Sequence, residues 1–298
     1  MPASVRIHTL EAAPPNAADL RTLLTTLLAT DPDEANIVKQ ERESAVYLTP
    51  PIRLPGQPEP VRLIVKSRSL TTLRTRLQHA VGLSRAARQM RGSRLLRAAA
   101  LPAAPCLATA TRITASQRLD VLVMELVPGT SLLHHLASSE LTIPQQLVLA
   151  DRMGSLVADL AHANLFNRDM KPSNVIIAPD HTPVIIDTVA IRTIRGGRAR
   201  NTARVRMLAS LLIEPIGCNV RPRGTLIYRV LRAECQTTLA RTLGRAPDPS
   251  LHTRRVLKAL IRTTAKRVHK LLSTRGPFEP MVNPLAKPSS HEVPATHG

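Results

Sequence analysis

The segment NLFNRDMKPSNVIIAPDHTPVIID, residues 164–187, constrains the fold more than any other part of this chain. It holds two short runs of β-branched residues, 174–178 and 183–187, separated by PDHT, a sequence typical of a hairpin turn. Asp169 lies in a loop ahead of the hairpin, and Asp187 ends its second strand. A hairpin of this length is expected to fold the second carboxylate back beside the first.

The polar residues of this segment are of the types that phosphoryl transfer requires. A loop carboxylate such as Asp169 can orient and deprotonate an attacking hydroxyl, and Lys171 can reach the transferred phosphate. Asn174 and Asp187 offer hard oxygen donors for magnesium. The sequence therefore predicts Asp169 and Lys171 as catalytic residues, and Asn174 and Asp187 as metal ligands.

NRDMKPSN, residues 167–174, resembles the catalytic loop H-R-D-L-K-x-x-N of protein kinases. The matching residues are Arg168, Asp169, Lys171 and Asn174. Asn167 replaces the histidine, which affects the packing of the loop more than its chemistry. The segment after the hairpin keeps the aspartate of D-F-G, but Thr188 and Val189 replace the phenylalanine and the glycine.

Two upstream segments extend this resemblance to the nucleotide site. IVK, ending at Lys66, resembles the strand lysine that holds the α- and β-phosphates of ATP. VLVMELVPGTSL, residues 121–132, resembles the hinge strand, where the backbone of Glu125 and Val127 would bind adenine. The resemblance thus implies ATP and Mg²⁺ as cofactors.

Gln89 occupies the position where the family pattern places a glutamate that pairs with the strand lysine. A glutamine can accept a hydrogen bond from Lys66, but it brings no charge, and charge-assisted bonds are roughly twice as strong as neutral ones. The expected result is a nucleotide site that holds Lys66 less firmly than a glutamate would.

The order of the predicted elements, strands first and helices second, indicates an α+β chain with a small β-rich N-lobe and a larger α-helical C-lobe. We expect a strand at 119–127 and helices at 67–100, 131–138, 145–163, 202–214, 224–242 and 252–272. The expected domains are a leader helix at 1–30, an N-lobe at 31–127, a C-lobe at 128–275 and a disordered tail at 276–298.

Several details are similar to the lipopolysaccharide core kinases, the Kdo/WaaP family. The similar segments are IVKQERESAVYL (37–48), ARQMRGSRLLRAAALPAAPCLA (87–108) and IIDTVAIR (185–192). The first has no glycine, and the last follows the I-D-L-x-R form rather than D-F-G. This resemblance implies transfer of phosphate to a sugar hydroxyl of a lipid-linked glycan at the inner face of the cytoplasmic membrane.

The charge distribution favours anionic partners. The formal net charge is +20, and residues 192–206 and 254–270 carry clustered arginine and lysine without any acid. An anionic glycolipid, another phosphorylated substrate or an anionic membrane surface suits such segments. A GC-rich genome and a solvated basic helix face are the plainer explanations. Aromatic residues make up only 1% of the chain, so nucleic acid is not an expected partner.

The expected location is the cytoplasm, with peripheral association at the inner membrane face. The three cysteines are widely scattered, which fits a reducing compartment, and the N-terminal residues show no signal-peptide pattern. No run of apolar residues is long enough to span a membrane.

Two other functions stay open. A serine/threonine protein kinase is favoured by Lys171-Pro172 directly after Asp169-Met170, although no A-P-E follows Asp187. A catalytically weak pseudokinase scaffold is favoured by Gln89 and by the absence of glycine from 37–48.

Overall fold

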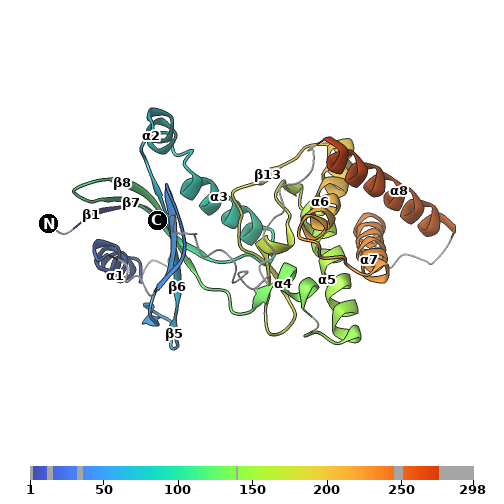
Figure 1. Cartoon of the computed structure of the whole chain (residues 1–298), viewed down its shortest axis with the longest axis horizontal. Helices are drawn as coiled ribbons and strands as arrows, with labels where there is room; N and C mark the ends of the chain where they lie inside the picture. Colours follow the sequence, from blue (N-terminus) through green and yellow to red (C-terminus); the bar gives the residue numbers. More distant parts are fainter. Residues whose placement is uncertain (1–2, 12–15, 32–35, 139, 245–250, 275–298) are drawn as a thin grey trace, which may run out of the picture. The chain divides into compact units, whose positions relative to one another are not determined.

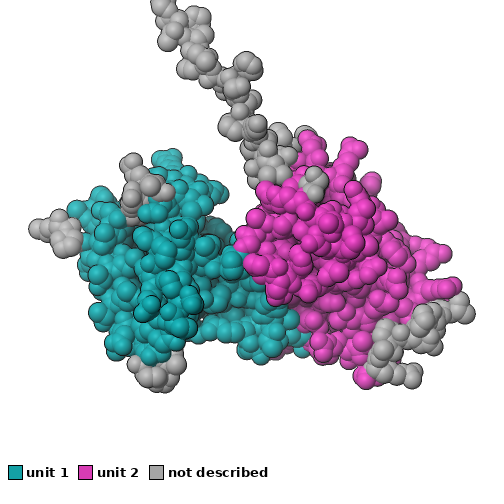
Figure 2. All heavy atoms as spheres, turned by 90° about the horizontal axis from the view of Figure 1, so that it is seen from below, with its two compact units in different colours: residues 1–128, 163–167, 184–194 teal, residues 129–162, 168–183, 195–298 magenta. Residues whose placement is uncertain are grey.

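The computed structural model describes residues 3–11, 16–31, 36–138, 140–244 and 251–274 (Figure 1). The chain forms two compact units, coloured differently in Figure 2. Unit 1 comprises residues 1–128, 163–167 and 184–194, and unit 2 comprises 129–162, 168–183 and 195–298. The expected disordered tail, 276–298, lies outside the described residues.

Unit 1 is built on a six-stranded antiparallel sheet with the strand order β1-β7-β8-β6-β3-β2. The strands are β1 (Ser4–Leu10), β2 (Ile37–Glu41), β3 (Ser44–Leu48), β6 (Leu63–Ser69), β7 (Cys106–Ile113) and β8 (Arg118–Glu125). The predicted buried strand near 119–127 is β8. The unbroken apolar run of this strand fits its central place in the sheet.

The N-terminal residues form part of this sheet and its core, rather than only a leader helix. β1 pairs with β7, a strand that the sequence pattern did not predict. Helix α1 (Ala17–Ala29) buries Leu20, Leu24 and Leu28 in the main core cluster of unit 1. These leucines recur every four residues and so lie on one face of the helix. Full burial of one such side chain contributes about 1.5–3 kcal/mol.

The predicted helical region 67–100 is divided in the structure. β6 continues to Ser69, α2 spans Leu73–Ala80, and α3 spans Arg85–Ala98. Gly82 lies between the two helices with a φ of 69°, a backbone conformation that favours glycine. The carboxylate of the buried Asp120 accepts hydrogen bonds from Ser84 Oγ at 3.0 Å and from Ala86 N at 3.2 Å. Asp120 on β8 thereby fixes the start of α3.

Short strand pairs complete the sheet structure. β4 (Ile52–Arg53) pairs with β5 (Pro60–Val61), and β10 (Leu165–Asn167) pairs with β13 (Ile191–Thr193). β9 (Thr130–Ser131) pairs with β11 (Val175–Ile177). The two predicted strands of the 164–187 segment are confirmed as β11 and β12 (Pro183–Ile185).

Unit 2 is helical. Its helices are α4 (Leu132–Ala137), α5 (Ile143–His162), α6 (Gly197–Gly217), α7 (Gly224–Leu243) and α8 (Leu251–Thr274). The predicted helices past residue 200 are confirmed, with α6 starting five residues earlier than the predicted 202. The β-rich N-terminal part and the helical C-terminal part confirm the expected α+β architecture. Among the described helices, none is long and apolar enough to cross a membrane.

Candidate active site

The loop that follows β10 brings three of the predicted site residues together within unit 2. Lys171 Nζ lies 3.2 Å from Asp169 Oδ1, and both side chains are about two-fifths exposed, at 42% and 40%. Asn174 Nδ2 donates hydrogen bonds to the carbonyl oxygen of Asp169 at 3.1 Å and to its Oδ2 at 3.3 Å. The carboxylate is therefore oriented by an amide and a cation while solvent still reaches it.

The orientation of Asn174 suits a hard metal ion. Its amide nitrogen faces Asp169, so its carboxamide oxygen is the atom that can serve as a ligand. Oxygen donors of this kind are what Mg²⁺ selects.

Glu214 fixes the position of Ser173 near the end of this loop. The sequence analysis did not identify this residue. Glu214 lies on α6 and is 6% exposed. Its Oε2 accepts from Ser173 N at 2.8 Å, and its Oε1 accepts from Ser173 Oγ at 2.5 Å. The available signal was a single acid in the apolar run LLIEPIG, because a buried carboxylate requires hydrogen-bond donors.

Unit 1 holds the predicted nucleotide lysine and the second predicted metal ligand. Burial lowers the pKa of the Lys66 ammonium, and the negative charge of Asp187 partly opposes that effect. Asp187 Oδ2 lies 3.1 Å from Arg85 Nη2, and its Oδ1 accepts from Val189 N at 3.2 Å. Arg85 gave no signal in the sequence, because its role depends on where α3 begins.

Gln89 makes contacts that differ from those expected. Its side-chain Nε2 donates to the carbonyl oxygen of Ile186 at 3.0 Å, and its backbone carbonyl oxygen accepts from Thr188 Oγ1 at 2.6 Å. No Gln89–Lys66 hydrogen bond occurs in the part of the chain that the structure describes. A Cβ on Gly92 would lie 2.1 Å from Thr188 O, so α3 packs directly on this backbone. Gln89 thus contacts the backbone of the residue before Asp187 and the side chain of the residue after it, and so positions Asp187 from both sides.

The predicted hinge residues lie at the end of β8 and just beyond it. The N–H of Glu125 donates to Pro105 O at 2.9 Å, and the N–H of Leu126 donates to Arg62 O at 2.9 Å. Within the described residues, the N–H of Val127 has no backbone acceptor. That group remains available to a ligand.

A cavity of about 540 Å³ lies in unit 1 between the β2–β3 hairpin, β6 and α3. Its size is within the range of about 300–1,000 Å³ that is usual for small-molecule sites. Lys66, Arg85 and Gln89 contribute to its walls. The other basic residues that line it are Lys39, Arg42 and Arg68. Three acids, Glu41, Glu43 and Asp120, also line the cavity, and Lys39 and Arg68 form ion pairs with the first two. The five basic residues still outnumber the acids, and this net charge suits the phosphate groups of a nucleotide.

The predicted site residues therefore divide between the two units. Asp169, Lys171 and Asn174 lie together in unit 2, whereas Lys66, Gln89 and Asp187 belong to unit 1, as do both hinge residues. No cluster of three or more His, Cys, Asp or Glu side chains that could hold a metal occurs among the described residues. The predicted magnesium ligands are one carboxamide, Asn174, and one carboxylate, Asp187, and so would not form a cluster of that composition.

Comparison with known families gives a match over about a third of the chain. Residues 112–212 match the ABC1 atypical kinase-like domain. This result supports assignment of the chain to the protein-kinase-like superfamily. The matched part of this kinase-like chain runs from the end of β7 into α6, and it includes the hinge, the 168–174 loop and Asp187. No match was found among curated proteins. The closer resemblance to lipopolysaccharide core kinases is not confirmed.

Proposed function

We propose that this chain is an ATP- and Mg²⁺-dependent phosphotransferase with an alcohol acceptor. The observation that carries the proposal is the geometry of the 168–174 loop, where a lysine and a carboxamide each lie within 3.3 Å of a solvent-accessible carboxylate. Kinase-like domains generally use ATP and Mg²⁺, and the ABC1 match covers this loop.

Each residue has a defined role in this proposal. Asp169 accepts the proton of the attacking hydroxyl, and Lys171 stabilises the charge of the transferred phosphoryl group. Asn174 and Asp187 would hold Mg²⁺, which would offset the negative charge of the phosphate groups. Lys66 anchors the nucleotide phosphates, and the backbone of Glu125 and Val127 binds the adenine.

The proposed acceptor is a sugar hydroxyl on an anionic, lipid-linked glycan. Support comes from the resemblance to the lipopolysaccharide core kinases and from the basic segment 192–206. Arg204 of this segment does not contribute, because its guanidinium forms a buried ion pair with Glu234 on α7. A protein acceptor is the alternative. Phosphopeptides detected by mass spectrometry after incubation with a proteome would favour that alternative.

The proposal is tested by measuring magnesium-dependent ATP turnover with candidate acceptors. We expect Asp169→Asn and Asp187→Ala each to lower turnover at least about a hundredfold, because each removes a group used in the transition state. Asp159→Asn is the matched control, since this carboxylate belongs to an exposed ion pair with Arg241. Unchanged turnover in both active-site variants would refute the assignment.

A pseudokinase is the second candidate, and the contact between Arg85 and Asp187 specifically favours it. This ion pair engages a predicted metal ligand, and Gln89 adds no negative charge near Lys66. The two candidates are separated by calorimetric titration with ATP and Mg²⁺. If the chain binds ATP without turning it over, and the Arg85→Ala variant also shows no turnover, the pseudokinase is favoured.

A further inference from the structure

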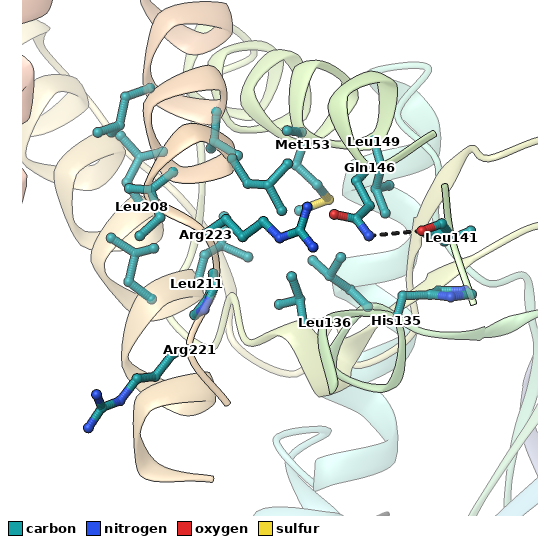
Figure 3. A pocket seen from close by; sticks show the side chains of 18 of the residues that line it. His135, Leu136, Leu141, Gln146, Leu149, Met153, Leu208, Leu211, Arg221 and Arg223 are labelled. Atoms are coloured by element: carbon teal, nitrogen blue, oxygen red, sulfur yellow. Dashed lines mark hydrogen bonds between the residues drawn. The ribbon is translucent and has the colours of Figure 1, made fainter. Parts of the chain in front are cut away.

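A second cavity lies wholly within unit 2, and no residue of the 168–174 loop lines it. It has a volume of about 200 Å³, is partly open to solvent, and is lined by residues of α4, α5, α6 and α7 and of the segments beside them. Its walls are mostly aliphatic, and they include Leu136, Leu149, Met153, Leu208, Leu211 and Val230 (Figure 3). An apolar cavity of about 150 Å³ is large enough to hold a benzene molecule. This cavity therefore has room for a short hydrocarbon chain.

One end of the cavity is polar. Figure 3 shows the guanidinium of Arg223 extending towards Met153 and the amide of Gln146, whereas Arg221 points away. Gln146 Nε2 donates to Leu141 O at 2.9 Å, so the amide oxygen is the group that remains for other contacts. Arg223 forms no ion pair with any acid in the described part of the chain.

Two further polar atoms at the cavity lack hydrogen bonds. Ser138 Oγ and His135 Nδ1 are buried without a hydrogen-bond partner, and both residues line the cavity. The other ring nitrogen of His135 contacts Thr130 Oγ1 at 2.6 Å, and Nδ1 itself lies 3.9 Å from a carboxylate oxygen of Glu140. Buried polar atoms of this kind are normally satisfied, so a bound molecule or water is expected to reach them.

These features restrict the class of ligand. The aliphatic walls require an apolar body. Arg223 is exposed, so its guanidinium lies at the rim of the cavity, where it can pair with an anionic group. A peptide or a folded partner exceeds the volume. The mostly aliphatic walls do not suit the polar ribose and phosphate groups of a nucleotide. A neutral hydrocarbon would make no use of the guanidinium at the rim.

We propose that this cavity binds a single-chain amphiphile with an anionic head, of the fatty-acid class. The alkyl chain lies among the leucines of α5 and α6, and the carboxylate lies on the guanidinium of Arg223. Ser138 Oγ is within the same cavity and can donate a hydrogen bond to the ligand.

The test is calorimetric titration of the whole chain with decanoate below its micelle concentration, at about pH 8. Saturable binding of one decanoate per chain is expected, and decanol is expected to bind about tenfold more weakly because it lacks the charge. Arg223→Gln should abolish the preference for decanoate over decanol. Arg232→Gln is the matched control, because Arg232 is an exposed arginine on α7, the helix that Arg223 precedes, and does not line the cavity.

A second variant tests the cavity without touching its charge. Ala150 is 5% exposed and lines the cavity, so Ala150→Leu should reduce binding of both ligands. Its far-ultraviolet circular dichroism would confirm that the chain is folded. The proposal is overturned if wild type shows no saturable binding, or if Arg223→Gln keeps the preference. It is also overturned if binding occurs only to vesicles of anionic phospholipid, which would indicate surface adsorption. Turnover of ATP plays no part in these measurements.

Discussion

At the scale of single residues, Lys66 is a half-buried cation whose partial burial opposes its charge. Burial lowers its pKa, so the folded chain binds this proton less tightly than the unfolded chain does. The resulting cost to stability is fully present below the folded pKa and disappears as pH rises through the unfolded value near 10.5. Lys66 is therefore retained at the expense of stability, which is common for functional residues.

Replacing this lysine separates its role in binding from its role in folding. We expect Lys66→Met to weaken ATP binding about tenfold or more, since hydrogen bonds between charged groups contribute about 1.5–3 kcal/mol. The free energy of unfolding at neutral pH should stay the same or rise. Calorimetry and urea denaturation measure the two effects, with the exposed Lys258→Met as control. A large loss of stability would contradict this account.

The three cysteines are predicted to be chemically inert in the folded chain. All three are buried. Burial raises the pKa of each thiol, to about 11 for Cys235. Because the thiolate is the reactive form, a disulfide-exchange reagent at about pH 8 should label the native chain slowly. All three thiols should react rapidly in denaturant. Fast labelling of the native chain would show that at least one thiol is accessible to the reagent.

At the scale of elements, the close packing of α5 against α7 depends on Gly154. A Cβ at this position would lie 2.3 Å from Val230 O and 2.8 Å from Ala233 Cβ. We expect Gly154→Ala to destabilise the chain by about 1–3 kcal/mol, because overpacking forces the backbones apart.

Denaturant unfolding of Gly154→Ala measures this effect, and Gly224→Ala is its matched control. No heavy atom lies within 4 Å of the Cβ position of Gly224, which opens α7. If the two variants lose the same stability, the close helix contact is not the cause.

At the scale of the whole molecule, the net charge of +20 predicts an electrostatic attraction to anionic surfaces. Arg198 and Arg206 on α6 and Lys266 on α8 line one groove of unit 2. Each basic residue near an anionic membrane contributes about 1 kcal/mol. We expect binding to vesicles that contain phosphatidylserine and little binding to neutral vesicles.

Vesicle sedimentation measures this interaction. Raising the salt concentration to about 0.5 M should abolish binding, because salt shortens the Debye length and so screens the attraction. The triple variant Arg198→Gln, Arg206→Gln and Lys266→Gln should bind more weakly than a triple variant at Arg74, Arg88 and Arg91, which lie on α2 and α3. Equal binding of the two variants would show that total charge, rather than this groove, is responsible.

The sequence by itself determined the local features of this protein. The spacing of Asp169, Lys171 and Asn174 in one short loop, the paired strands that follow it, and the amphipathic periods of α6, α7 and α8 all depend on near neighbours in the chain. Such features follow from backbone geometry and apolar periodicity, and the sequence pattern contains both.

Only the tertiary structure decided contacts between residues that are distant in the sequence. Three contacts each join segments separated by at least 41 residues. They are the pairing of β1 with β7, the ion pair of Arg85 with Asp187, and the hydrogen bonds from Ser173 to Glu214. Gln89 illustrates the reason. The sequence gives its residue type and places it in a helix. Its hydrogen-bond partners depend on how α3 packs against the backbone at 186–188, and the folded core determines that packing.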